Sequence, residues 1–169
     1  MFAARGPGGA LGAFADWFAD ADPDELRVEY VRTFDHKRRN ALYVTFAAHG
    51  DMRRRGEALL AFKSLYRANG FEPRPDELPD YLPMVLQFAA QAPTEAANAA
   101  LALARPGIEL VAKSLADAAS PWAPVLGAVR ACLPPLDAAS RRVLAAVAAD
   151  GPPEELVGVA SVRPEGVGA

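Results

Sequence analysis

One stretch decides the fold of this chain: Glu72-Pro73-Arg74-Pro75-Asp76-Glu77-Leu78-Pro79-Asp80-Tyr81-Leu82-Pro83-Met84-Val85-Leu86-Gln87-Phe88. It begins as an acidic loop rich in proline and continues as an apolar segment with the composition of a helix. A proline disfavours the helical region for the residue before it, so residues 72–75 are predicted to be extended. The stretch therefore predicts a stiff loop that leads directly into a buried helix.

Two residues of this stretch are candidate N-caps for that helix. With Asp76 as the cap, Glu77 would lie in the first turn, where the macrodipole favours a negative charge, but Pro83 would lie inside the helix at a cost of roughly 3 kcal/mol. With Asp80 as the cap, Pro83 would lie in the first turn and cost little. Either start holds the corner Leu78–Tyr81 at a helix N-terminus, a position suited to presenting a carboxylate and an aromatic ring to a partner.

The composition predicts one soluble helical domain. The chain has 169 residues, of which 51% are hydrophobic and 23% charged, which is enough for a real core. Alanine is abundant while isoleucine, valine and threonine are scarce, and this favours helix over sheet. The net charge of −3 is too small to indicate nucleic acid or a membrane surface as a general partner. No apolar stretch reaches the ~20 residues of a membrane span.

Cysteine and histidine are too few for a disulfide framework or a structural zinc site. Cys132 is the single cysteine, which excludes an intrachain disulfide and fits a reducing compartment. Its apolar neighbours predict a buried helical position for it. Only His36 and His49 could add nitrogen ligands, so we expect no metal site. Together these features predict a cytoplasmic protein.

The order of motifs predicts an all-α, single-domain bundle of about six to seven helices. Asp22-Pro23-Asp24-Glu25 is typical of a helix start with Asp22 as the N-cap, and the helix that follows carries an apolar stripe. Residues 41–48 are ambiguous by period, and without a partner strand they are predicted to be irregular or a helical turn. Further helices are predicted at residues 10–19, at about 52–69 with a stop at Asn69-Gly70, from Thr94 to Pro106, from Ile108 to Ala119, from Ser120 onward and at 137–150.

The two ends of the chain differ from the middle in composition. Residues 1–10 are rich in glycine and proline and are predicted to be a flexible leader. The helical domain is predicted to occupy residues 11–150. Proline and glycine dominate again in residues 151–169, which are predicted to be a disordered tail.

The residues by themselves favour a binding module over an enzyme. The arginines at 53–55 oppose the dipole of a predicted helix at about 0.3–1 kcal/mol each; they could bind an anion, although a solvated helix face explains them more simply. Gly56 in that helix indicates the close approach of a backbone or a ligand. His49 beside Asp51 could be a general base, but no serine or cysteine nucleophile is placed to use it.

Four ordered motifs resemble the delta subunit of respiratory nitrate reductase, the NarJ-type assembly chaperone within the TorD-like family of molybdoenzyme maturation chaperones. They follow one another over about residues 25–90, and Ser120-Pro121-Trp122 extends the resemblance to about residue 133. The motifs are Glu29-Tyr30-Val31-Arg32-Thr33-Phe34-Asp35, His49-Gly50-Asp51-Met52-Arg53-Arg54-Arg55-Gly56, Leu65-Tyr66-Arg67-Ala68-Asn69-Gly70 and Glu77-Leu78-Pro79-Asp80-Tyr81-Leu82-Pro83.

The resemblance implies an all-helical cytoplasmic chaperone of nitrate assimilation that is not an enzyme. Such a chaperone binds the N-terminal tail of the apo catalytic alpha subunit, a basic and amphipathic segment, before membrane attachment. It supports insertion of the molybdenum cofactor, molybdopterin guanine dinucleotide, and we expect no tightly bound cofactor in the chain itself. We expect a monomer or a weak homodimer. Family members usually carry more helical sequence before the first motif than the ~25 residues of this chain.

Carried over residue by residue, the motifs supply the candidates for peptide binding. An apolar groove would take one face of the tail, while the carboxylates of Glu72, Asp76, Glu77 and Asp80 would meet its basic side. The alternative is a nucleotide-binding or molybdopterin-cofactor-binding adaptor in which Arg53, Arg54 and Arg55 hold phosphates. The peptide-binding candidates are Tyr30, Phe34, Asp35, His49, Asp51, Arg53, Arg54, Gly56, Leu78, Asp80, Tyr81 and Leu82.

Overall fold

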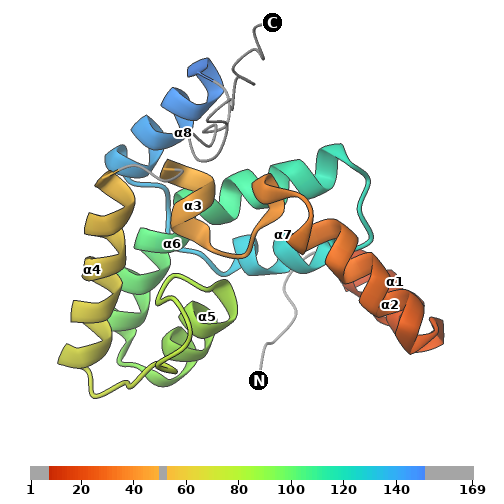
Figure 1. Ribbon diagram of the computed structural model, residues 1–169, viewed down its shortest axis with the longest axis horizontal. Helices are drawn as coiled ribbons and strands as arrows, with labels where there is room; N and C mark the ends of the chain where they lie inside the picture. Colours follow the sequence, from red (N-terminus) through yellow and green to blue (C-terminus); the bar gives the residue numbers. More distant parts are fainter. Residues whose placement is uncertain (1–7, 50–52, 151–169) are drawn as a thin grey trace, which may run out of the picture.

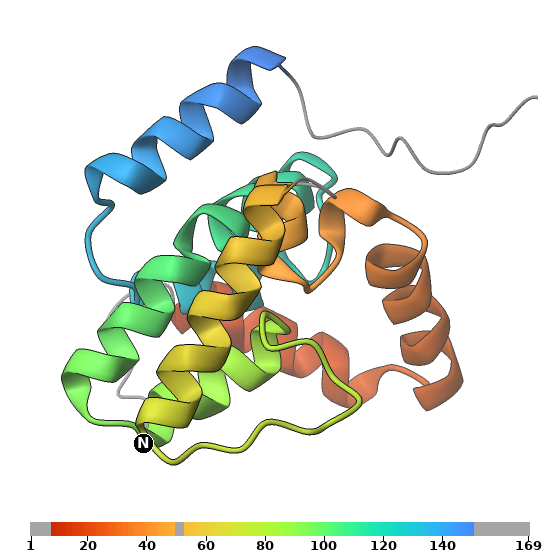
Figure 2. The same cartoon turned by 60° about the vertical axis from the view of Figure 1, so that its left-hand side comes forward.

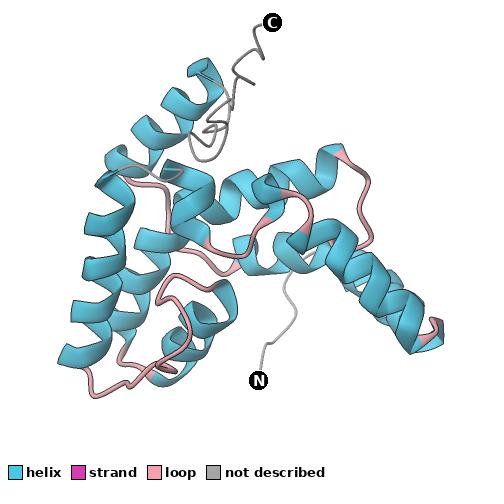
Figure 3. Ribbon diagram, in the orientation of Figure 1, coloured by secondary structure: helices cyan, strands magenta, loops and turns pink. Residues whose placement is uncertain are grey.

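The computed structural model describes residues 8–49 and 53–150, and within these ranges the helices are joined by loops and turns, with no β-strand (Figures 1 and 3). The predicted fold class is therefore confirmed. The leader and the tail lie outside the described residues, except that residues 8–10 already belong to the first helix. The helices are α1 (Gly8–Asp20), α2 (Pro23–Tyr30), α3 (Val44–His49), α4 (Arg53–Ala68), α5 (Leu82–Gln91), α6 (Thr94–Asp117), α7 (Ala123–Ala131) and α8 (Ala138–Asp150), together with a π-helix, η1 (Val31–Asp35), and a 3-10 turn, η2 (Arg38–Asn40).

Helix α6 is the centre of the bundle. It runs through the middle of the molecule, and α3, α4, α5, α7 and α8 all pack against it (Figures 1 and 2). Its inward side chains are mostly small, so neighbouring helices can approach closely while apolar area is still removed from water. The α6 residues of the apolar core are Ala96, Ala100, Ala104, Ile108, Val111, Ala112 and Leu115.

The prediction that Pro106 ends a helix is wrong, because α6 continues through it to Asp117. A proline inside a helix lacks an N–H and costs about 3 kcal/mol. The close packing at the next residue, Gly107, outweighs that cost. A Cβ at Gly107 would lie 2.6 Å from the backbone carbon of Val44 and still nearer to its oxygen. Pro106 and Gly107 thus mark the place where α3 crosses α6 in direct backbone contact, and packing at this crossing keeps the helix continuous.

The loop that opens the deciding stretch is irregular, and α5 begins later than either predicted cap. Its N-cap is Tyr81, and Pro83 lies in the first turn, the low-cost position expected for the later start. The loop is fastened to the segment before α3: the Leu82 N–H donates to the Leu42 oxygen at 2.8 Å. Residues 41–48 are therefore a short helix preceded by a single bridge, between Tyr43 and Tyr81, which agrees with the helical turn predicted there.

Several helix ends follow the predicted capping chemistry. The Asp22 carboxylate accepts from the N–H groups of Asp24 and Glu25 at 2.8 and 3.3 Å, and Gly70 has the left-handed φ of 67° that ends α4. Cys132 is different. It is exposed and forms the C-cap of α7, so the prediction of a buried position is wrong.

Helix α1 is held to the bundle by aromatic rings. Trp122, at the start of α7, lies 5.6 Å from Phe14 and 5.7 Å from Trp17, centroid to centroid, and 5.6 Å from Phe34 on the other side. One half-buried indole therefore joins α1 to η1. Among residues 8–49 and 53–150, none of the helices has both the length and the apolar character needed to cross a membrane.

A Phe14→Ala variant should loosen α1 without unfolding the bundle. The ring contacts Trp122 at the boundary of the core, so its loss should cost about 1–2 kcal/mol, less than the 3–5 of a fully buried phenylalanine. Hydrogen exchange should accelerate in α1 and stay unchanged in α6. Phe18→Ala is the matched control, since that ring is 46% exposed and should matter less. Equal acceleration in α6 would contradict a peripheral role for Phe14.

Candidate functional site

Asp80 is fully buried, with 0% exposure. One of its carboxylate oxygens, Oδ2, accepts from the Thr45 N–H at 3.1 Å and from the Thr45 hydroxyl at 2.6 Å. Thr45 lies in the first turn of α3, where backbone N–H groups lack intrahelical acceptors. The other oxygen, Oδ1, is buried with no hydrogen-bond partner among the described residues. The prediction that this corner presents the Asp80 carboxylate outward is therefore wrong: Asp80 fastens α3 to the start of α5.

A tyrosine cluster joins the first and last motifs. Burial, followed by the interaction with the Tyr81 side chain, raises the pKa of Tyr30. The Tyr43 hydroxyl donates to Glu77 Oε1 at 3.0 Å, and burial, followed by this bond, raises the pKa of Tyr43 to about 12. The Tyr66 hydroxyl donates to the Pro79 oxygen at 2.8 Å. These groups remain protonated at neutral pH and hold the loop against the bundle.

The remaining predicted residues do not converge on one surface. Phe34 and Leu82 are buried in the core, whereas Asp35 is exposed and Leu78 is 40% exposed. Asp51 lies outside the described residues. The motifs therefore contain much of the framework of the fold, and most of their residues are not gathered at a common binding site.

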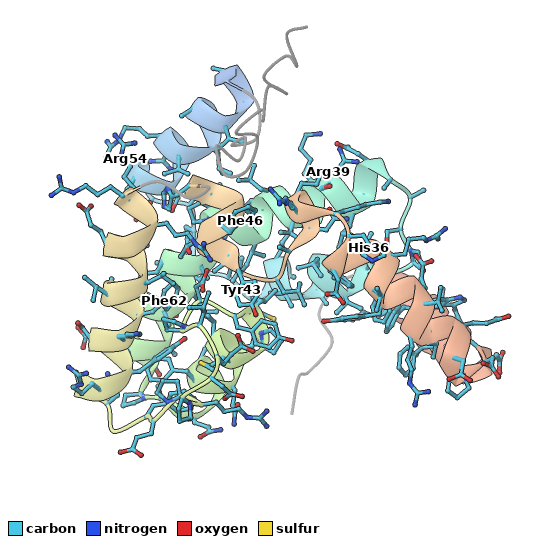
Figure 4. The ribbon with its side chains drawn as sticks, viewed as in Figure 1. His36, Arg39, Tyr43, Phe46, Arg54 and Phe62 are labelled. Carbon is cyan, nitrogen blue, oxygen red and sulfur yellow. The ribbon has the colours of Figure 1, made fainter. Side chains whose placement is uncertain are left out.

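The three arginines at the start of α4 have three different environments. The Arg53 Nε atom lies 3.7 Å from Glu57 Oε1 in an exposed pair, and the Arg55 guanidinium lies 5.3 Å from the centroid of the Phe46 ring. Arg54 is exposed at the outer edge of the bundle (Figure 4). This arrangement adds no support to the phosphate-binding alternative. Gly56 has open space where a Cβ would be, so the predicted close approach there is wrong among the described residues.

A groove with a volume of about 650 Å³ lies between α4, α6 and α8. On α4 and α6 the lining residues are spaced three and four apart, so each helix presents one face to it. Most of the lining is small and apolar, and the side chain of Leu103 is 41% exposed within it. The lining consists of His49, Ala61, Ser64, Leu65, Ala99, Ala102, Leu103, Pro106, Asp137, Ala139, Ser140 and Val143.

Two titratable groups border this groove. Burial, and then the charge of Arg54, lower the pKa of His49, so the imidazole is neutral at pH 7. Hydrogen bonds from Ser140 lower the pKa of Asp137, so its carboxylate is ionised. Asp137 is the one carboxylate among the described lining residues. The acidic loop that was predicted to meet a basic ligand supplies none of the lining, since Glu72, Asp76, Glu77 and Asp80 all lie elsewhere.

This geometry suits binding. A concave, mainly apolar surface framed by helices takes the apolar face of a helical segment, and one ionised carboxylate at its border can meet a cation. Of the predicted binding residues that the structure describes, only His49 lines the groove. The sequence held one signal for it: alanine, leucine and proline at the i, i+3, i+4 and i+7 positions of residues 99–106, a stripe of small side chains on a helix that also faces the core.

Comparison with known proteins identifies the relatives of the chain. A family model described as nitrate reductase delta subunit matches residues 4–127. Over 119 residues, 70% of the chain and 18% of the relative, it is 40% identical to the nitrate reductase-like protein NarX of Mycobacterium tuberculosis. Over 85 residues, 50% of the chain and 46% of the relative, it is 45% identical to a probable nitrate reductase molybdenum cofactor assembly chaperone NarJ of Bacillus subtilis. Identity to the NarJ chaperone of Escherichia coli is 32% over 114 residues, 68% of the chain and 48% of the relative. The chain thus spans less than half the length of these relatives.

Proposed function

The chain belongs to the nitrate reductase delta subunit family, and we propose that it is a chaperone for the assembly of a nitrate reductase. The observation that carries this proposal is the family match over residues 4–127, which includes all of α4 and α6, the two helices that form the floor of the groove. Relatives named as molybdenum cofactor assembly chaperones support the same role. The chain would act in the cytoplasm by binding, without catalysing a reaction.

The ligand that we propose is the N-terminal tail of the apo catalytic alpha subunit, bound as an amphipathic helix in the groove. Leu103 and Leu65 offer apolar surface to the tail, and alanines at 61, 99 and 102 leave room for its larger side chains. Burial of the tail's apolar face is the favourable term for binding, and the cost of immobilising the peptide is subtracted from it, so we expect the binding to be reversible. The subunit is then held unfinished while its molybdenum cofactor is inserted, and it can be released afterwards.

Titration calorimetry tests this proposal. A synthetic peptide with the N-terminal sequence of the cognate catalytic subunit should bind at micromolar concentration or below, with a negative heat-capacity change because apolar surface is buried. A scrambled peptide of the same composition is the control, because it lacks the apolar face. The absence of heat at micromolar concentrations, or equal binding of the scrambled peptide, would overturn the proposal.

Filling the groove should weaken peptide binding while leaving the fold intact. Ala102 lines the groove and is half-buried, whereas Ala116 lies on the same helix and is exposed. Ala102→Trp places an indole in the space proposed for the ligand, and we expect the affinity to fall at least about tenfold, or 1.4 kcal/mol. Ala116→Trp is the matched control and should bind like the wild type. Calorimetry on both variants, after thermal melts of each, checks this prediction; equal affinities would contradict it.

A further inference from the structure

Helix α8 forms one wall of the groove but belongs neither to the core nor to the family-matched region. The described residues of the apolar core, and those packed against it, end at Leu133, and the family match ends at residue 127. Within α8, Ser140 is the one buried side chain among those described. Yet α8 and its cap supply four of the lining residues, Asp137, Ala139, Ser140 and Val143. Helix α8 therefore contributes more residues to the lining of the groove than to the apolar core.

The connection to α8 is anchored so that its first turns stay beside the groove. The Arg105 guanidinium of α6 donates to the Pro134 oxygen and is itself paired with Glu109 at 2.9 Å. The Asp137 carboxylate accepts from the Ser140 N–H at 2.6 Å and so caps the helix. Beyond these turns α8 extends away from the bundle (Figures 1 and 2). The anchor lies at the end of α8 that borders the groove, which fixes the lining residues in place.

We propose that α8 is a ligand-contacting wall, which gives the groove its selectivity for a helical segment with an apolar face and a lysine or arginine beside it. Val143 packs on the apolar face, and the Asp137 carboxylate pairs with the cation. The composition of the lining carries this choice of partner, because Asp137 is the one carboxylate among the described lining residues and none of them is a lysine or an arginine. The inference rests on the proposed function, and it adds that residues beyond the family-matched region complete the site.

Two lysine substitutions in the full chain test whether the groove-lining part of α8, and not the rest of the helix, contacts the peptide. Val143 lines the groove, while Val147, one turn later and also half-buried, does not. Val143→Lys removes an apolar contact and repels a basic ligand, so the affinity for the alpha-subunit peptide should fall at least about tenfold. Val147→Lys, with the same chemistry on the same helix, should stay within about twofold of the wild type. Val143→Ala should weaken binding in the same direction by less.

The results distinguish this inference from the proposed function. If the wild type binds the peptide and both lysine variants bind equally well, the inference is overturned and the proposed function stands. Tighter binding by Val143→Lys would also overturn it, because α8 would then shield the groove. If the wild type does not bind the peptide, the proposed function falls and the inference falls with it.

The charge on Asp137 can be removed without removing the cap, because asparagine caps helices as well as aspartate does. Asp137→Asn should therefore leave α8 in place and weaken peptide binding about threefold at low salt, the size of an exposed ion pair. The difference in affinity between Asp137→Asn and the wild type should vanish at high salt, because screening there weakens the ion pair of the wild type. Equal affinities of the two proteins at low salt would exclude a pairing role for Asp137.

Discussion

A Gly107→Ala variant is expected to be destabilised by more than about 3 kcal/mol, beyond the usual cost of an added methyl group in a packed core. The new Cβ would lie 2.6 Å from the carbon and 2.8 Å from the Cα of Val44. A side chain in that place could rotate away, but backbone atoms cannot, so α3 would have to move off α6. Urea unfolding followed by circular dichroism measures the loss.

A glycine-to-alanine substitution in α7 should instead increase the stability of the chain. Gly127 in α7 has open space where its Cβ would be, so Gly127→Ala gains helix propensity and should stabilise the chain by about 0.5–1 kcal/mol. The two variants together separate the effect of the α3–α6 crossing from that of alanine itself. If Gly107→Ala melts like the wild type, the two helices do not approach as closely as described.

An Asp80→Ala variant is expected to lose about 3 kcal/mol of stability. It removes two hydrogen bonds to Thr45 and leaves a buried N–H and a buried hydroxyl without an acceptor, at about 1–3 kcal/mol for each unsatisfied group. Asp80→Asn should be milder, because its carbonyl oxygen can still accept from Thr45. Asp76→Ala, an exposed position in the same loop, is the control and should change stability by less than about 0.5 kcal/mol.

Thermal and urea unfolding of these variants, combined in a double-mutant cycle with Thr45→Val, isolates the energy of the Asp80–Thr45 pair. A structural role requires a coupling energy and a large loss of stability. If Asp80→Ala unfolds like the wild type and instead weakens peptide binding, the carboxylate faces a ligand, as the sequence first suggested.

The local rules of the chain predicted its helices well. Asp22, Gly70 and Asp137 each mark a helix end where capping chemistry places one, because a cap is satisfied by neighbours within a few residues. The alanine-rich composition predicted the fold class for a similar reason, since propensity is a local property. The late start of α5 after the Pro-rich loop also follows from the fixed φ of proline.

The predictions that were wrong concern contacts between segments far apart in the chain. Pro106 was expected to end a helix because nothing near it in sequence reveals Val44 against Gly107. Asp80 was expected to face outward because its acceptor role toward Thr45 spans the distance from α5 to α3. Most of the groove's lining was not predicted, because it comes mainly from α4, α6 and α8, and a stripe of alanines on a helix does not distinguish a groove from the core.

Val44 sits where three distant segments meet: its N–H donates to the Asp80 oxygen at 3.2 Å, and its carbonyl lies against Gly107. Residues before α6 therefore have no complete surface to pack on until α6 has left the ribosome. Chains are made from the N-terminus at roughly 5–20 residues per second. For several seconds of synthesis, the rings of Phe62, Tyr66 and Phe88, fully enclosed at the end, have no cover. The nascent chain thus passes through an unfinished state of its own, as does the subunit that the finished domain is proposed to hold.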